Sequence, residues 1–277
     1  MLLLWAVPAS AHQAVNGATG RDAWVTALLL ASALVYGVGA LRLARRAHAH
    51  EGRETAYFAL AWLTLALALH SPLEDLAARS FAAHMLQHLI LMTVAAPWLV
   101  LAAPWPRMLW ALPRLARRGA ARAFKSAAAR RLRALFGRPW AAFAWHAAAL
   151  WAWHLPAAFD AATTHESVHR LQHLSFFASA LLFWYAVLRG SRTPATALAL
   201  LFCTMMHSGL LGALLSLAPV ALYAPYRAFA GSASAALSDQ QLGGLLMWVP
   251  GGFVYAAVAL AILARVLLRS EAASRAN

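Results

Sequence analysis

Seven apolar stretches, each of about the length that crosses a lipid bilayer as a helix, constrain this chain more than any other feature. A bilayer core needs roughly 20 apolar residues in helical form, and none of these stretches alternates apolar with polar residues as a strand does. A helix also satisfies its own backbone hydrogen bonds in lipid. The sequence therefore predicts an all-α, polytopic membrane protein with seven transmembrane helices, at residues 24–44, 55–70, 81–103, 140–158, 168–188, 195–218 and 243–268.

The composition excludes several other classes of protein. The chain is 62% hydrophobic and 12% charged, whereas soluble domains are about 45–50% apolar and about 25% charged. A soluble enzyme, a secreted domain and a disordered protein are all inconsistent with this balance. A single cysteine excludes a disulfide framework and an all-thiolate metal site.

The basic residues predict the orientation of the chain in the membrane. If the amino terminus lies outside, 19 of the 23 lysines and arginines fall on the inner side of the seven spans. This asymmetry is the positive-inside pattern, and it places the carboxy terminus in the cytoplasm. The formal net charge of +14 is then explained by topology, so we expect no nucleic-acid partner.

The amino-terminal segment leaves two interpretations open. Residues 1–11 resemble a signal-peptide remnant, because Ala9-Ser10-Ala11 has the small-x-small form of a cleavage site. The segment has no basic region and only a short apolar core, so an uncleaved start fits equally well. If the chain is cut there, it begins at His12, whose amine and imidazole together chelate a metal. Residues 12–277 are predicted to form one seven-helix domain.

The segment 104–139, on the predicted cytoplasmic side, carries ten basic residues and no acidic one. Phe124, Ala128, Leu132 and Leu135 recur at helical spacing, while most of the cations lie off that line. This pattern predicts an amphipathic helix lying on the anionic inner leaflet, so the lipid bilayer is itself a predicted partner.

The histidines sort to the opposite side from the arginines. Ionisable residues at membrane depth are costly and usually face a bundle interior or a cavity, so a one-sided set needs a shared explanation. Of the 12 histidines, eight fall in the outer half of the predicted topology or just beyond it: His12, His70, His84, His88, His154, His165, His169 and His173.

Two segments of the chain repeat one pattern. Residues 84–89 and 169–174 both read H-x-L-Q-H-L, and each follows an H-x-P turn that begins at His70 or at His154. Histidines four apart share one helix face. The two copies run in the same direction, which predicts a parallel internal repeat of spans 2–3 and 4–5 about an axis along the membrane normal. Such an axis brings the two histidine pairs together near the outer surface.

Imidazole with thioether and thiol donors is a ligand set that suits Cu(I). These ligands are neutral, so no anion has to be buried before the metal arrives. A histidine pair is also a common packing pair, and methionine and cysteine are ordinary fillers of apolar gaps. The predicted metal ligands are His84, His88, His169 and His173, assisted by His70, His154 and His165, with Met206, His207 and Cys203 on one face of the sixth span as a further, inner set.

Four acidic residues lie at the predicted outer turns. Carboxylates commonly orient metal-binding imidazoles by accepting their second N–H. The residues predicted for this role are Asp75, Asp160, Glu166 and Asp239.

Several motifs occur together in order along the chain. They are the run 84–89 continuing through Ala95-Ala96-Pro97, the segment 154–156 with Glu166 and its two following histidines, His207-Ser208-Gly209, and the run 239–244 leading into Met247-Trp248. Together they resemble the multi-span CtaG family of cytochrome c oxidase assembly factors. The segment 104–139 is longer and more basic than this pattern accounts for, and nothing is carried over onto it.

The resemblance implies a non-catalytic protein of the bacterial plasma membrane. Its expected role is to help mature the terminal oxidase by supplying copper, with cytochrome c oxidase subunits as partners. Two alternatives remain open. A haem-binding membrane cytochrome or haem-delivery factor needs one histidine from each of two helices, which the repeat supplies. An intramembrane zinc hydrolase is less favoured, because the chain lacks H-E-x-x-H and its acids lie in turns.

Overall fold

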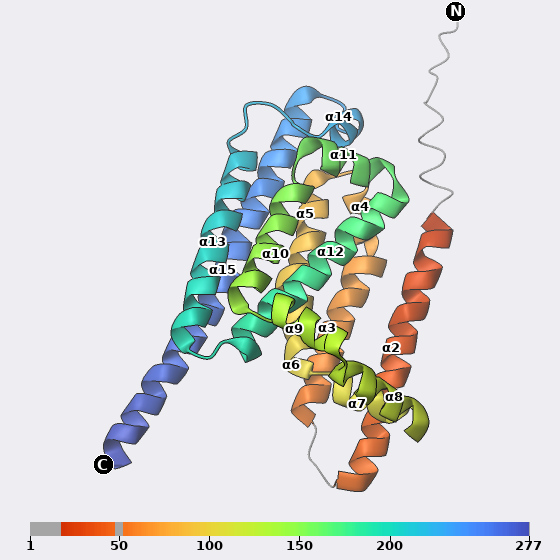
Figure 1. Cartoon of the computed structure of the whole chain (residues 1–277). Helices are drawn as coiled ribbons and strands as arrows, with labels where there is room; N and C mark the ends of the chain where they lie inside the picture. The colour runs from red at the N-terminus through yellow and green to blue at the C-terminus, as the bar shows by residue number, and fades with distance from the viewer. Residues whose placement is uncertain (1–17, 48–51, 277) are drawn as a thin grey trace, which may run out of the picture.

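The computed structural model describes residues 18–47 and 52–276, and within them the chain forms helices and no strand (Figure 1). The predicted signal-peptide remnant, residues 1–11, and His12 lie outside the described residues.

The long helices run between two ends of one bundle. They are α2 (Ala18–Ala47), α3 (Gly52–His70), the continuous α5 (Phe81–Leu89), η1 (Ile90–Ala95) and α6 (Ala96–Ala102), then α10 (Pro139–Trp153), α12 (Glu166–Tyr185) continued by η2 (Ala186–Gly190), α13 (Pro194–Ser216) and α15 (Ala233–Ala276).

Short helices lie at the two ends of the bundle (Figure 1). At one end are α4 (Pro72–Ala77), α11 (Pro156–Thr164) and α14 (Ala224–Phe229). Toward the other end, where the carboxy terminus also lies, are α7 (Trp105–Ala111), α8 (Arg114–Lys125) and α9 (Ala127–Phe136).

Within the described part of the chain, five helices are long and apolar enough to cross a membrane, and they match the first, third, fifth, sixth and seventh predicted spans. The second and fourth predicted spans correspond to α3 and α10. The first turn of α3 contains Arg53 and Glu54, and α10 has only 15 residues, fewer than the roughly 20 that a bilayer core requires. The all-helical membrane class is therefore confirmed, while the count of seven spans and the internal repeat stay predictions.

Large apolar side chains on the outside of the bundle are consistent with a lipid environment. Leu34 on α2 is 68% exposed, Leu210 on α13 is 55% exposed and Phe253 on α15 is 72% exposed. A soluble protein of this size would bury or disperse such side chains, because a large contiguous apolar surface promotes association in water.

Two hydrophobic cores hold the helices together. The larger one joins α5, α10, α12, α13 and α15, and includes the fully buried rings of Phe176, Phe183 and Trp184. The smaller one, around Tyr36 and Phe58, joins α2 and α3 to the end of α6.

A π-helical segment interrupts the third predicted span, and Pro97 accounts for its geometry. The backbone N–H of Ala96 reaches back five residues to the carbonyl of Leu91. The next donor in that register would be Pro97, which has no N–H, so the carbonyl of Met92 loses its helical partner. The indole of Trp184 on α12 donates to that carbonyl at 2.7 Å, and this bond ties the two helices together inside the core.

The segment 104–139 is helical, as predicted, but it is not one continuous helix. The backbone turns at Ser126, where ψ is 159°, and separates α8 from α9. Phe124 therefore belongs to a different helix from Leu132 and Leu135, so the single apolar line predicted for them is wrong. All three side chains are more than half exposed.

Candidate metal centre

Four histidines from two distant parts of the chain lie together inside the bundle. His84 and His88 come from α5, and His169 and His173 come from α12. The ring centroids are 4.9 Å apart for His88 and His173, and 5.5 Å apart for His84 and His169. The structure thus brings together the two pairs that the sequence singled out. We call these four residues the histidine cluster.

The ring nitrogens of the cluster lie at distances compatible with one small ion. Nε2 of His84 and Nε2 of His88 are 3.1 Å apart, and one ligand atom each of His84, His169 and His173 lie within 4.8 Å of one another. Two imidazole nitrogens on one tetrahedral metal are roughly 3.3 Å apart, for metal–nitrogen bonds of about 2.0 Å. The α5 pair already has this spacing, and the rings of the α12 pair are about as close, with centroids 4.2 Å apart against 4.3 Å for the α5 pair.

Tyr226 of α14 fixes the orientation of the His84 ring. Its hydroxyl donates to the carbonyl of Ala77 at 3.0 Å and lies 2.7 Å from Nδ1 of His84. Burial raises the pKa of this hydroxyl, and the charge of Asp239 raises it further, so it stays protonated. Because its one proton goes to Ala77, Nδ1 of His84 is the protonated ring nitrogen and donates to the tyrosine oxygen. Nε2 then turns its lone pair toward the cluster, as a metal ligand must.

Two further nitrogens of the cluster are buried without a hydrogen-bond partner, namely Nδ1 of His88 and Nε2 of His173. Buried polar atoms are nearly always paired, and an exception calls for an explanation such as an ion. His84 and His88 are 3% and 2% exposed, while His169 and His173 are partly exposed. The cluster therefore opens toward the surface on its α12 side.

Aromatic rings line the cluster on its inner sides. Phe159 lies 5.3 Å from the ring of His84, and Phe176 lies 4.8 Å edge-on from that of His88. Both phenylalanines are fully buried. They keep water away from the inner pair, and an apolar wall strengthens any bond between the imidazoles and a cation.

His154 lies beside the cluster and makes contacts of its own. Its Nδ1 lies 2.6 Å from the carbonyl of Leu150 and is therefore the protonated nitrogen, which leaves Nε2 facing the sulfur of Met85 at 3.4 Å. A thioether has no proton to donate, so two acceptors face each other in a buried place. Successive residues of a helix point in different directions, so the Met85 thioether lies against His154 although Met85 follows His84 in sequence.

The other two predicted assisting histidines lie apart from the cluster. His70, at the end of α3, is exposed and lies 3.3 Å from the hydroxyl of Thr26. His165 caps α12, is exposed, and contacts Thr164 and the carbonyl of Ala161. The structure does not bring either residue to the cluster.

The inner set on α13 is not assembled around one point. Met206 is 48% exposed on the outside of the bundle. His207 is partly buried, accepts a hydrogen bond from the indole of Trp151 at 3.4 Å and lies against Phe143. Cys203 is a partly buried free thiol. Met206 and His207 therefore lie in different surroundings, one on the outside of the bundle and one against two aromatic rings.

Asp239 has a different partner from the one predicted. Its carboxylate accepts from the backbone N–H groups of Phe81 and Ala82 at 2.6 and 3.3 Å, and from the hydroxyl of Ser80 at 2.7 Å. It therefore caps the first turn of α5 from α15, and α5 carries His84 and His88. An anion at a helix amino terminus is stabilising, since the unpaired N–H groups there are partly positive.

The rest of the run 239–244 packs α15 against its neighbours. The carboxamide oxygen of Gln240 accepts the backbone N–H of Leu222 at 2.6 Å. A Cβ on Gly243 would meet the ring of Phe81 at 2.5 Å, and one on Gly244 would meet the carbonyl of Gly212 at 2.6 Å. These glycines let α15 approach α5 and α13 closely, and together with Asp239 they set the position of α5.

The other three predicted acids lie at the same end of the bundle, but the contacts described below differ from the predicted contacts with imidazoles. Asp75 is exposed, and Glu166 pairs with Arg170 in an exposed i,i+4 contact. Asp160 on α11 accepts from the backbone of Ala224, and partial burial raises the pKa of its carboxyl. It therefore joins α11 to α14.

Two residues of the site were not found from the sequence. Tyr226 lies in the connection between the last two predicted spans, and its immediate neighbours do not mark it as a site residue. The one available signal was its spacing of three residues from Tyr223, because residues three apart share a helix face. Met85 lies inside the H-x-L-Q-H-L run itself. Its thioether was an available signal, because soft donors were already expected there.

The fold and the cluster define an α-helical membrane protein with a partly buried cluster of four histidines. The family model of the cytochrome c oxidase caa3 assembly factor matches residues 34–269, which is most of the chain. The chain belongs to this family of assembly factors, as its motifs predicted. Comparison with curated proteins and with solved structures gives no match.

Proposed function

We propose that this protein binds Cu(I) through the histidine cluster and delivers it to a cytochrome c oxidase subunit during assembly of the oxidase. Membership of the assembly-factor family supplies the oxidase as the partner. The observation that carries the choice of cargo is the convergence of four imidazoles, together with the contact between His154 and the Met85 thioether. Such donors suit Cu(I).

The openness of the site supports transfer over storage. The inner pair, His84 and His88, is buried and has the spacing of two ligands on one ion, while the α12 pair is partly exposed. Ligand exchange with a docked partner requires an incomplete coordination shell, because a closed tetrahedral site holds its metal. We infer that the ion enters and leaves on the α12 side. The protein performs no catalytic turnover in this scheme.

The orientation follows from the charges. We infer seven spans in the bacterial plasma membrane, with α3 and α10 completing the five long helices, the amino terminus outside and the carboxy terminus in the cytoplasm. The histidine cluster then lies toward the outer surface, which is the side from which copper arrives in this scheme. The basic residues at the other end of the bundle support this orientation.

Copper loading of the purified protein tests the proposal. After incubation with Cu(I) and removal of the excess, the wild type is expected to retain bound copper and His84→Ala/His88→Ala to lose most of it. The matched control is His70→Ala/His165→Ala, which removes two imidazoles from the same end of the bundle outside the cluster and is expected to bind like the wild type. Equal copper content in the wild type and the cluster variant would refute the proposal.

Haem remains the alternative cargo, and the contacts within the cluster disfavour it. A porphyrin between His84 and His169, or between His88 and His173, would have to separate rings that lie within 5.5 Å of each other. A Soret band in the protein reconstituted with haem, lost in the cluster variant, would establish haem in place of copper.

A further inference from the structure

A cavity of about 380 Å³ lies between α2 and the turn that joins α7 to α8. Figure 1 places α7 and α8 toward the end of the bundle opposite α11 and α14. Four arginines line the cavity: Arg42 and Arg45 from α2, and Arg114 and Arg117 from α8. We call it the arginine pocket.

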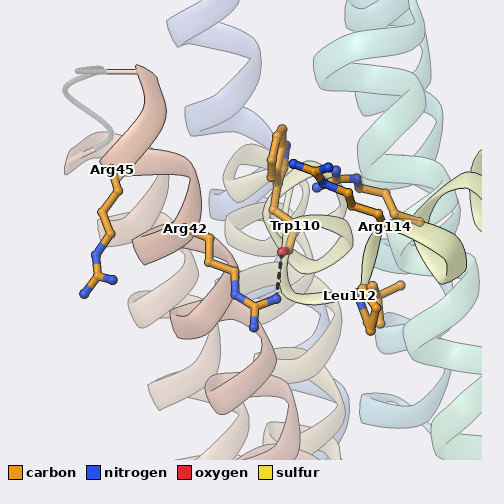
Figure 2. Close-up of a pocket in the computed structure, with 7 residues that line it drawn as sticks. Arg42, Arg45, Trp110, Leu112 and Arg114 are labelled. Carbon is orange, nitrogen blue, oxygen red and sulfur yellow. Dashed lines mark hydrogen bonds between the residues drawn. The ribbon is translucent and has the colours of Figure 1, made fainter.

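The walls of the pocket are positioned by contacts to the backbone and to one indole ring. Arg42 crosses from α2 to donate to the carbonyl of Ala111 at 2.6 Å and that of Trp110 at 3.4 Å, and Figure 2 shows it reaching toward Trp110. The guanidinium of Arg117 lies 4.0 Å from the centre of the Trp110 ring, a cation–π contact. Arg114 lies near this ring in Figure 2.

No carboxylate within the described ranges 18–47 and 52–276 forms an ion pair with these four arginines, whereas Arg107 pairs with Glu54 and Arg170 with Glu166. Positive charges from two helices facing one cavity repel each other at the low effective dielectric of a protein surface. An anion between them removes this cost. The pocket is therefore organised to receive negative charge.

The chemistry of the lining favours a phosphate that carries an apolar tail. Guanidinium groups bind phosphate oxygens in paired hydrogen bonds. Leu112 lines the same cavity and is 37% exposed, and Leu115, one turn further along, is 79% exposed. An ordinary anion gains nothing from these leucines, whereas the acyl chains of a phospholipid would cover them.

We propose that the arginine pocket binds the phosphate headgroup of an anionic phospholipid and thereby fixes α8 to the membrane surface. Basic pockets beside transmembrane helices on the cytoplasmic side bind such headgroups. The neighbouring helices fit the same surface, because α8 and α9 are strongly cationic and expose Phe124, Leu132 and Leu135. This inference does not depend on the identity of the metal.

Lipid retention by the intact protein in detergent tests the pocket. Native mass spectrometry would compare added phosphatidylglycerol with phosphatidylcholine, and a third arm would add inorganic phosphate as competitor. Arg114→Gln/Arg117→Gln is expected to bind phosphatidylglycerol roughly 30-fold more weakly, at about 1 kcal/mol for each arginine lost. Arg118→Gln/Arg122→Gln removes the same charge from α8 outside the pocket and is expected to stay within about twofold of the wild type.

A second variant tests whether the loss of lipid binding in the double variant comes from misfolding. Arg45→Gln leaves the Trp110 stacking intact and is expected to weaken phosphatidylglycerol binding roughly fivefold. Equal losses in the pocket and control variants would show a diffuse charge effect and overturn the proposal. Equal retention of phosphatidylcholine, or full displacement of the lipid by inorganic phosphate, would overturn it as well, since the site would then not select an anionic lipid.

Discussion

The histidine cluster and the arginine pocket gather nitrogen-bearing side chains at opposite ends of one bundle, and they are built in opposite ways (Figure 1). The cluster uses side chains that are neutral when deprotonated, and its inner pair is at most 3% exposed. The pocket uses permanently charged groups and stays open. Burying a charge costs far more than burying a neutral ligand, so only the imidazoles are placed at depth.

The two regions also depend on different cores. The cluster lies in the larger core, where the Trp184 indole of α12 donates to Met92 of η1, the continuation of α5, and where α5 is capped from α15. The pocket adjoins the smaller core that joins α2 to the rest of the bundle. Damage to one region is therefore expected to leave the other intact. Two of the three substitutions below, Gly39→Ala and Asp239→Ala, test this independence.

The largest effect is expected for Gly39→Ala, which acts on the pocket side. A Cβ on Gly39 would lie 1.8 Å from the backbone carbonyl oxygen of Arg107, so α2 must move away from α7. We expect the free energy of unfolding to fall by about 3 kcal/mol, with loss of phosphatidylglycerol binding and unchanged copper content. Thermal unfolding in detergent and native mass spectrometry measure these outcomes.

Gly37→Ala is the matched control for this substitution. Gly37 lies on the same helix and a Cβ there meets nothing within 4 Å. Alanine is the better helix former, so stability is expected to stay equal or rise by up to about 1 kcal/mol. If both variants melt alike, the close packing of α2 against α7 is not what holds the pocket.

An intermediate effect is expected for Asp239→Ala, which acts on the cluster side. The substitution removes the cap from the first turn of α5, and the loss of its hydrogen bonds is expected to cost about 2 kcal/mol. Copper binding should weaken because His84 lies in the next turn, while lipid binding should not change. Asp75→Ala removes an exposed acid from the same end of the bundle and should stay within about 0.5 kcal/mol; equal losses in the two would argue against the cap.

The smallest effect is expected for Tyr226→Phe, which tests the role of a single hydroxyl group. Removing the group that accepts from Nδ1 of His84 is expected to weaken Cu(I) binding roughly tenfold, measured by competition with a Cu(I) chelator. Tyr185→Phe is the control, since Tyr185 is 50% exposed. Unchanged Cu(I) affinity in Tyr226→Phe would show that the tyrosine does not set the His84 tautomer.

Most of the membrane character and the two histidine pairs followed from local pattern. Apolar length and i,i+4 spacing are properties of a single helix, so His84 with His88, and His169 with His173, were predictable as pairs. The prediction of one amphipathic helix through Phe124 and Leu132 was wrong because a backbone turn at Ser126 carries no strong composition signal. The sequence predicted that Asp239 orients the imidazoles. It could not show that the N–H groups nearest to this carboxylate are those of Phe81 and Ala82 in the first turn of α5.

The sequence by itself determined the class of protein, its charge asymmetry, its family motifs and the residues predicted to bind a soft metal, because these depend on composition and on spacing along one helix. Only the tertiary structure decided that α5 and α12 place their histidines face to face, that Tyr226 and Asp239 hold the α5 pair in place, and that Met85 lies against His154. It also decided that four arginines from α2 and α8 share one cavity. Contacts between distant helices depend on packing and on close approach at residues such as Gly39 and Gly244, which periodicity along one helix does not encode.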